Sequence, residues 1–396
     1  MIAITRPDIR RSDASRGGNG GVPVDRELAK RLPLRILLAE AALAALLPCV
    51  VAAQGLPAPD TIEWTLHKTA DGAHPDGDEQ TYVWLMNRAR QDPAAEGEFL
   101  ATIDDPLVRW RLTTFGVDLG RLRAEFATLP ATPPAAFDAR LYEAARAHSL
   151  DMIARDRQDH AGQKERVRAA GFRSLLYRGN AYAFSESALE GHAAFNVDWG
   201  GGGGTGMQGS RPHRQAIMSV DGSCTSVGVA VVRDLDRRNQ VGPFVVTGNY
   251  AQADESYDHH YDRFLVGTVW ADANGNGRYD ADEGIEGVTV TLDRGRYYAV
   301  TAAGGGYAIP LPEPGPNRVH FAGAGVPPRT RIVTVGAVSV LADYVVAGSR
   351  ESIAAPEPGA AALGPAVALT LAALSWRGGG GARAGGPSAR PPPRPP

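Results

Sequence analysis

The spacing of apolar residues predicts two amphipathic helices in the first half of the chain. Residues 79–93 carry apolar side chains on one helical face and end at a proline, which stops a helix. Residues 137–156 contain a single stripe at intervals of four, four, three and four residues, with charged residues opposite. The stripe consists of Phe137, Leu141, Ala145, His148 and Met152. We therefore expect His148 to be a hydrogen-bonded core histidine.

Helical patterns and loops alternate further along the chain and end in strand-like runs. The expected segments are a loop after Gly171, helices over 187–199 and from Ser210, and strands over 226–234 and 242–250. The two strands are expected to form an antiparallel pair. Together these segments predict a layered α+β domain at residues 78–255.

Residues 264–348 change to short β-rich runs separated by turns. The runs are FLVGTVW, GVTVTLD, YYAVTAA, YAIPLP, NRVHFAG, RIVTVGA and SVLADYVV. Seven short strands at regular spacing predict a small all-β sandwich. Residues 54–77 and 256–263 are expected to be linkers on either side of the α+β domain.

Residues 1–53 predict a secretory signal peptide with a long polar start. The basic Arg31 and Arg35 precede an apolar run, and Val51-x-Ala53 fits a cleavage site. The alternative is a membrane-anchoring helix. Residues 349–396 contain Pro356-Glu357-Pro358, an uncharged apolar stretch and an Arg-containing Gly/Pro-rich tail. This order predicts a C-terminal sorting signal, and the alternative is a low-complexity tail. We expect a secreted or cell-surface protein that contacts a membrane only through these terminal signals.

Charge and cysteine content narrow the classes of partner. The formal net charge of −3 provides no basic field for nucleic acid, so no nucleic-acid partner is expected. Cleavage after Ala53 would leave Cys224 as the only cysteine, and no internal disulfide would then form. No nucleophile signature surrounds Cys224, which is expected to be a small buried residue. The sequence carries no signal for an oligomeric state.

Two histidines and a glutamate give the α+β domain its candidate chemistry. His160 lies in a polar loop after the second helix, Glu186 lies in AFSESA, and His213 opens the short helix. Two imidazoles and a carboxylate could bind zinc, with His160 and His213 as ligands, or could move protons in a shared cavity. Sequence spacing alone does not bring the three side chains together.

A calcium loop is predicted between the first two β runs of the second domain. Residues 272–283 match the twelve-residue pattern at every position. The expected ligands are side-chain oxygens of Asp272, Asn274, Asn276, Asp280 and Glu283 with the backbone carbonyl of Arg278. Because no helices flank the loop, a structural calcium ion fits better than a switch.

The order of the segments over residues 80–252 resembles the CAP superfamily (cysteine-rich secretory proteins, antigen 5 and pathogenesis-related proteins) in its bacterial SCP-like form. The matching pieces include Asn87-x-x-Arg90, the helix with His148, the loop His160, and Ser210-x-x-His213. The resemblance implies an α-β-α sandwich with His160, Glu186 and His213 lining a cavity. The sequence departs at Ser185-Glu186-Ser187, where the family has Gly-Glu-Asn. A fourth cavity residue has no clear counterpart beyond Glu190.

Two further resemblances concern the second half of the chain. Gly267-Thr-Val-Trp270, the calcium loop and Gly306-Tyr307 resemble the SdrD B-like repeats of bacterial surface proteins. This implies a prealbumin-like or immunoglobulin-like sandwich that acts as a stalk or spacer. The order of Pro-Glu-Pro, apolar stretch and basic cluster resembles a PEP-CTERM sorting signal.

Three functions remain open from the sequence. The first is an exported binding protein that holds a lipid, a glycan or a cell-envelope component. The second is a metal-assisted hydrolase in which His160 and His213 hold zinc and Glu186 is the general base. The third is a purely structural adhesin. Calcium is the expected ion of the β domain in all three.

Overall fold

The computed structural model describes residues 60–346 apart from 202–203 and 312. The expected signal peptide at 1–53 and the C-terminal segment at 349–396 lie outside the described residues. We call residues 77–255 the α+β module, and residues 62–67 together with 264–346 the β module. No helix in the described part of the chain is long and apolar enough to cross a membrane.

A four-stranded sheet lies at the centre of the α+β module. Its order is β2 (Ala136–Phe137), β4 (Ser226–Arg233), β5 (Phe244–Ala253) and β3 (Ser174–Ser185). β4 and β5 form the predicted antiparallel pair. β3 replaces the loop expected after Gly171 and pairs antiparallel with β5, so it forms one edge of the sheet. Along this edge the Gln158 side chain donates to the carbonyl of Ala181 and accepts from the amide of Ala183.

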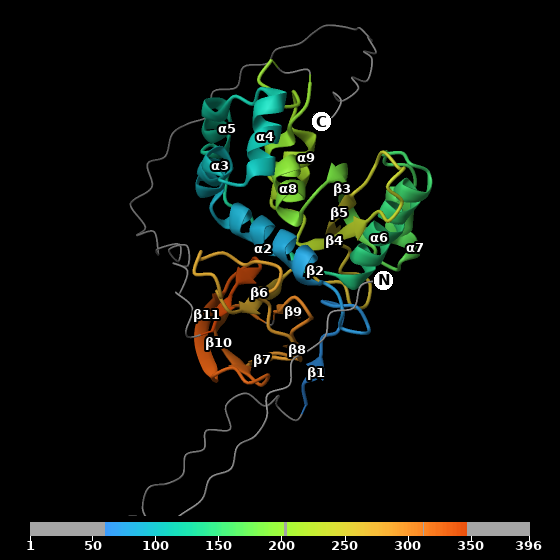
Figure 1. Ribbon diagram of the computed structural model, residues 1–396. Helices are drawn as coiled ribbons and strands as arrows, with labels where there is room; N and C mark the ends of the chain where they lie inside the picture. Colours follow the sequence, from blue (N-terminus) through green and yellow to red (C-terminus); the bar gives the residue numbers. More distant parts are fainter. Residues whose placement is uncertain (1–59, 202–203, 312, 347–396) are drawn as a thin grey trace, which may run out of the picture. The chain divides into compact units, whose positions relative to one another are not determined.

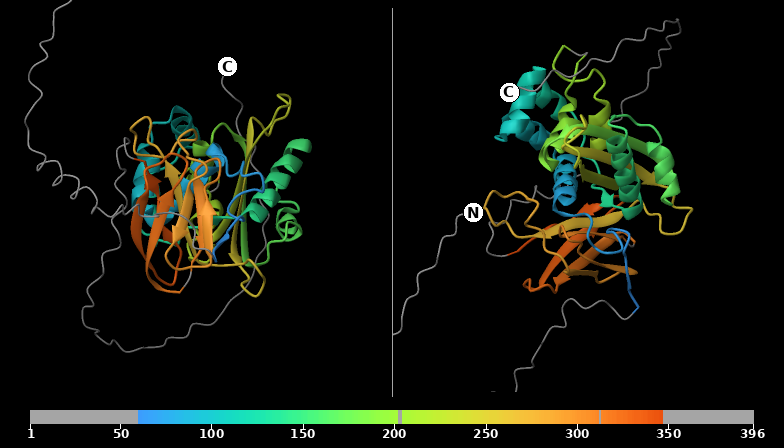
Figure 2. Two further views of the ribbon diagram at one scale, coloured as in Figure 1. Left: turned by 90° about the horizontal axis from the view of Figure 1, so that it is seen from below. Right: turned by 45° about the vertical axis from the view of Figure 1, so that its right-hand side comes forward.

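Helices cover both faces of this sheet (Figures 1 and 2). They are α2 (Gly77–Gln91), α3 (Pro93–Thr102), α4 (Pro106–Phe115), α5 (Leu119–Phe126), α6 (Ala139–Ala154), α7 (Gln163–Ala169), α8 (Ala188–Ala193), the π-helix η1 (Ala194–Asp198) and α9 (Pro212–Met218). α6 and α7 lie on one side, and α2, α8 and α9 lie on the other. The helices predicted over 79–93 and 137–156 are therefore confirmed as α2 and α6, except that Phe137, the first residue of the predicted stripe, lies in β2 and precedes the helix. The stretch over 187–199 is α8 continued by η1.

Aspartate caps fix the starts of most of these helices. Each of these aspartates precedes its helix and accepts a backbone N–H of the first turn. They are Asp92 for α3, Asp105 for α4, Asp118 for α5 and Asp138 for α6. In α3 and α4 the cap is followed by Pro93 or Pro106 at the first helical position, where the missing N–H has no partner to lose. The caps therefore account for where α3, α4 and α5 begin.

The β module consists of two sheets that share one apolar core. One sheet has the order β1 (Ile62–Glu63), β8 (Tyr297–Val300), β7 (Thr289–Leu292), β10 (Gly315–Ala322) and β11 (Arg329–Val335). The other contains β12 (Val340–Leu341), β6 (Phe264–Trp270), β13 (Tyr344–Val345) and β9 (Gly306–Pro310). Each predicted run contains a strand, and the seventh is divided into β12 and β13. Val290 and Phe321 from the first sheet pack in one cluster with Leu265 and Ile309 from the second.

The expected linker over 54–77 contains the first strand of the β module. Ile62 pairs in parallel register with Tyr297 of β8. Trp64 is buried in the core of the β module, with its ring against those of Tyr297 and Phe264. Burial of the tryptophan ring stabilises the attachment of this segment to the β module by on the order of a few kcal/mol. A linker exposed to solvent would not gain this free energy.

His67 makes the stability of this segment depend on pH. The ring is 1% exposed, with Nδ1 2.6 Å from the carbonyl oxygen of Trp64 and Nε2 2.9 Å from that of Val300. Burial lowers the pKa of His67 to about 4. Between about pH 6.5 and 4 the histidine is therefore protonated in the unfolded chain and neutral in the folded chain. The associated stability is complete above pH 6.5 and is lost as the pH falls toward 4.

We expect the free energy of unfolding to fall by roughly 3 kcal/mol over this interval because of His67 alone. Urea denaturation at a series of pH values measures the total slope, and the His67→Asn variant should show a shallower one. Parallel slopes in the two proteins would show that His67 does not titrate in this interval.

Candidate functional site

His160 lies exposed in the connection between α6 and α7. Its Nδ1 is 2.7 Å from Oε1 of Gln163, the first residue of α7, which fixes Nδ1 as the donor. Gln163 is buried, and its Nε2 donates to Oδ1 of Asn249 at 3.0 Å and to the carbonyl of Asn180 at 3.3 Å. The exposed histidine is thus attached to the edge of the sheet through a buried amide.

His213 lies on the other helical layer, at the start of α9. Asp198 accepts from its backbone N–H and from its ring Nδ1, each at 2.8 Å. The ring stacks on Phe195 with centroids 5.9 Å apart. Asn180 donates to the carbonyl of His213 at 3.0 Å. Asn180 is therefore the residue that connects the surroundings of His160 and His213.

Glu186 is exposed at the end of β3. Among the described residues, no hydrogen bond or ion pair joins any two of His160, Glu186 and His213. The buried carboxylate nearby is Glu190, which pairs with Arg111 at 2.6 Å and accepts from the backbone N–H of Glu186 at 2.6 Å. Burial raises the pKa of Glu190. Glu190 thus binds the backbone at the start of α8 and an arginine of α4. A catalytic role for Glu186 stays a prediction.

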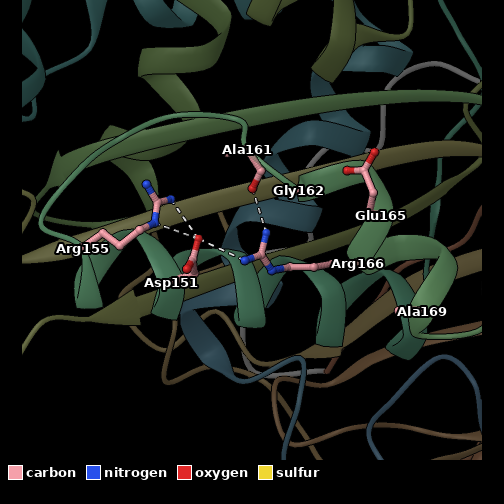
Figure 3. A pocket seen from close by; sticks show the side chains of 7 residues that line it. All are labelled: Asp151, Arg155, Ala161, Gly162, Glu165, Arg166 and Ala169. Atoms are coloured by element: carbon pink, nitrogen blue, oxygen red, sulfur yellow. Dashed lines mark hydrogen bonds and ion pairs between the residues drawn. The ribbon is translucent and has the colours of Figure 1, made fainter.

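An open pocket lies between α6 and α7, and its lining includes Ala161, the residue that follows His160 in the chain (Figure 3). It has a volume of about 610 Å³, and its lining residues are Asp151, Arg155, Ala161, Gly162, Glu165, Arg166 and Ala169. Asp151 pairs with Arg155 at 2.8 Å and with Arg166 at 3.0 Å, and its hydrogen bond to Arg155 lowers its pKa. Arg166 also donates to the carbonyl of Ala161. Both guanidinium groups already face a carboxylate.

The predicted calcium loop folds around its own polar groups. Asn274 and Asn276 each direct an amide group to Oδ2 of Asp280, at 2.6 and 2.7 Å. Glu283 accepts the backbone N–H groups of Ala273 and Asp280 at 2.8 and 3.0 Å. The two asparagine amides thus meet at Asp280, whereas the carboxylate oxygens of Asp272, Asp280 and Glu283 do not all lie within 4.8 Å of one another.

Asp272 supplies the test of whether a cation fits this loop. Asp272 and Glu283 are each 5% exposed, although both are carboxylates. Oδ2 of Asp272 accepts the N–H of Gly277 at 2.9 Å, but Oδ1 is buried without a hydrogen-bond partner. A buried, unpartnered carboxylate oxygen is costly unless a charge compensates it. The donor set, with oxygen ligands only, fits calcium.

A third polar group, not expected from the sequence, lies at the start of α2. Among the described residues it is the one group of three possible metal ligands whose atoms all lie within 4.8 Å, and it consists of His74, Asp76 and Glu79. Asp76 and Glu79 form a capping box, and His74 Nδ1 lies 2.7 Å from Glu79. This hydrogen bond raises the pKa of His74. The group is explained as a helix cap, which the Asp-x-x-Glu spacing could have revealed.

A buried pair of His192 and Glu96 also escaped the sequence analysis. Their side chains are fully buried and lie 2.8 Å apart, with Arg88 2.9 Å from the same carboxylate. The two residues come from α8 and α3 and are 96 positions apart, so no local sequence pattern predicts their contact. Because neither side chain reaches solvent, the pair supports the packing of α3 on α8 and offers no ligand site.

No protein-family model and no curated protein matches this chain. Among solved structures, the chain is similar to an extracellular protein containing an SCP domain from Bacillus anthracis str. Ames, with 16% sequence identity and a TM-score of 0.23. The match covers 36% of this chain and 41% of that chain, so less than half of the other protein is spanned. A TM-score this low assigns neither a fold family nor a function.

Proposed function

We propose that this chain is an exported SCP-like binding protein that holds a neutral, hydroxyl-rich ligand of the glycan class beside His160. The observation that carries the proposal is the balanced charge pairing at the pocket, where Arg155 pairs with both Asp151 and Asp159 and Arg166 pairs with Asp151. A charged ligand would have to separate these pairs. A sugar hydroxyl can instead donate to a carboxylate and accept from a guanidinium while the pairs remain intact.

The small residues of the pocket favour the same class of ligand. Ala161, Gly162 and Ala169 leave room between the paired charges. The apolar face of a sugar ring can lie on such a surface while its hydroxyl groups reach the rim. In this proposal the β module is a calcium-stabilised spacer, with the ion at residues 272–283.

The metal-assisted hydrolase is the second candidate, and one observation favours it. Gln163 and Asn180 connect the surroundings of His160 and His213 through hydrogen bonds of 3.3 and 3.0 Å. In this alternative His160 and His213 would hold the ion, and the ion would supply an activated water. The chain's own contribution would be to orient the two imidazoles, which Gln163 and Asp198 already do.

The proposal predicts that filling the pocket abolishes glycan binding. We would probe the full chain by calorimetry with neutral and with uronic-acid oligosaccharides of the bacterial envelope. Ala169→Trp, on the exposed surface of α7, should weaken binding of a neutral oligosaccharide at least tenfold because the indole occupies the pocket. Lys164→Trp, exposed on the same helix but outside the pocket lining, is the matched control and should bind normally.

The same protein preparations separate the two candidate functions. A binding protein leaves the oligosaccharide intact, and His160→Ala with His213→Ala changes affinity little. Release of shorter products by the wild type, lost in the double variant, would instead establish the hydrolase. Equal binding by Ala169→Trp and Lys164→Trp, or preference for the uronic acids, would overturn the proposed ligand class.

A further inference from the structure

The two modules meet through backbone approaches that only glycine permits. A Cβ atom at Gly77 of α2 would lie well under 3.0 Å from the carbonyl of Ala281, inside the calcium loop. A Cβ at Gly304 would lie 2.5 Å from the carbonyl of Asp76, and one at Gly306 would overlap the Gln80 side chain. Gln80 in turn donates to Thr268 of β6 at 2.7 Å. The contact between α2 and the β module is therefore a close-packed interface.

Two residues of the predicted calcium loop, Arg278 and Tyr279, lie in this interface. Tyr279 is buried in a cluster with Trp84 and Leu85 of α2 and Trp270 of β6. The rings of Trp84 and Trp270 meet edge to face at 6.1 Å. Cζ of Arg278 lies 4.7 Å from the ring centroid of Phe99, which belongs to α3. Two consecutive loop residues thus contact two helices of the other module.

The positions of these two residues depend on the carboxylates of the loop. Asp272 accepts the N–H of Gly277, directly before Arg278, and Glu283 accepts the N–H of Asp280, directly after Tyr279. Both carboxylates are buried, and Oδ1 of Asp272 has no partner. Two buried negative charges in one loop repel each other and favour an opened loop unless a cation is bound.

We propose that calcium bound by residues 272–283 holds Arg278 and Tyr279 against α2 and α3, so that calcium controls the docking of the α+β module on the β module. The inference rests on the calcium site of the proposed function and adds a consequence to it. The ion then acts as a clamp, by which we mean that it stabilises the contact between the two modules as well as the loop that binds it. Loss of calcium loosens the attachment of the ligand-binding module while both sheets persist.

Hydrogen–deuterium exchange of the full chain tests this coupling, with calcium binding measured separately by calorimetry. Saturating calcium should slow exchange in residues 80–91 of α2 at least tenfold relative to a chelated sample. Glu283→Gln removes one negative ligand with little change in shape and should abolish both calcium binding and the slowing. Asp282→Asn is the matched control, since Asp282 is exposed at a position of the loop that supplies no ligand. Exchange in β10, outside the loop, reports whether each variant is folded.

The outcomes distinguish the inference from the calcium site itself. Calcium binding with slower exchange in α2, in the wild type and in Asp282→Asn only, supports the clamp. Calcium binding with unchanged exchange in α2 would overturn the clamp and leave the calcium site standing. No calcium binding by a folded wild-type chain would overturn both.

Discussion

Gly228→Ala should destabilise the α+β module by about 3 kcal/mol or more. Gly228 lies in β4, where α6 crosses the sheet. A Cβ atom at this position would lie well under 3.0 Å from backbone atoms of Leu141 and Tyr142 in α6. Backbone atoms cannot rotate away as a side chain can, so the helix would have to move off the strand. Urea denaturation followed by circular dichroism at 222 nm measures the loss.

Gly209→Ala is the matched control for this substitution. A Cβ at Gly209 meets no atom within 4 Å, and its φ is not in the left-handed region. The control should unfold at the midpoint of the wild type, to within about 0.5 kcal/mol. If the two variants unfolded together, the close approach of α6 to β4 would not be a determinant of stability.

The second large effect is expected for Arg90→Met. Arg90 of α2 is fully buried, and it donates to the carbonyls of Ile217, Cys224 and Pro133 at 2.8, 2.7 and 3.3 Å. Burial lowers its pKa to about 10, which leaves the guanidinium charged at neutral pH. Methionine fills a similar volume but removes the donor from three carbonyls, of which those of Ile217 and Cys224 are buried. Relief from burying the charge offsets part of this cost, and we expect a net loss of about 3 kcal/mol.

The measurement is again the urea midpoint, with Arg109→Met as the reference. Arg109 forms an ion pair with Asp104 in which both side chains are largely exposed, so its removal should change stability by about 0.5 kcal/mol or less. Arg90→Met should also increase proteolysis near Pro133, because the guanidinium holds that segment against α2. A variant as stable as Arg109→Met would contradict the role assigned to Arg90.

Local patterns were sufficient for the helices and strands with regular apolar spacing. α6 and the β4–β5 pair follow from the sequence because their buried positions recur at the period of their own element. β3 does not, since Arg178, Gly179 and Asn180 interrupt any alternation. Asn180 is nevertheless buried, because it finds partners on α7 and α9 that are distant in sequence.

Some elements could have been recognised from signals that were present. Asp92-Pro93 and Asp105-Pro106 are helix starts, in which the carboxylate caps and the proline occupies the first helical position. They mark α3 and α4, which the apolar spacing left without a prediction. The motif residue Arg90 likewise proved to bind the backbone of the scaffold.

The candidate sites divide in the same way. The predicted calcium loop is a local pattern of twelve residues, and two of its three proposed carboxylate ligands, Asp272 and Glu283, are buried. A histidine cavity requires convergence of three segments, which spacing cannot supply. The structure brings the surroundings of His160 and His213 to Asn180 and leaves Glu186 exposed.

The pairing of β1 with β8 affects the order in which the chain can complete its fold. Ile62 and its partner Tyr297 are more than two hundred residues apart, with the whole α+β module between them. At roughly 5–20 residues per second, a ribosome would need about 10 to 50 seconds to add that partner. Trp64 cannot be buried before the strands of residues 264–345 are available, whereas the α+β module needs no strand beyond β5 for its own sheet. The β module is therefore discontinuous in sequence, and dividing the chain between residues 256 and 263 would place Trp64 and the core that buries it on two different polypeptides.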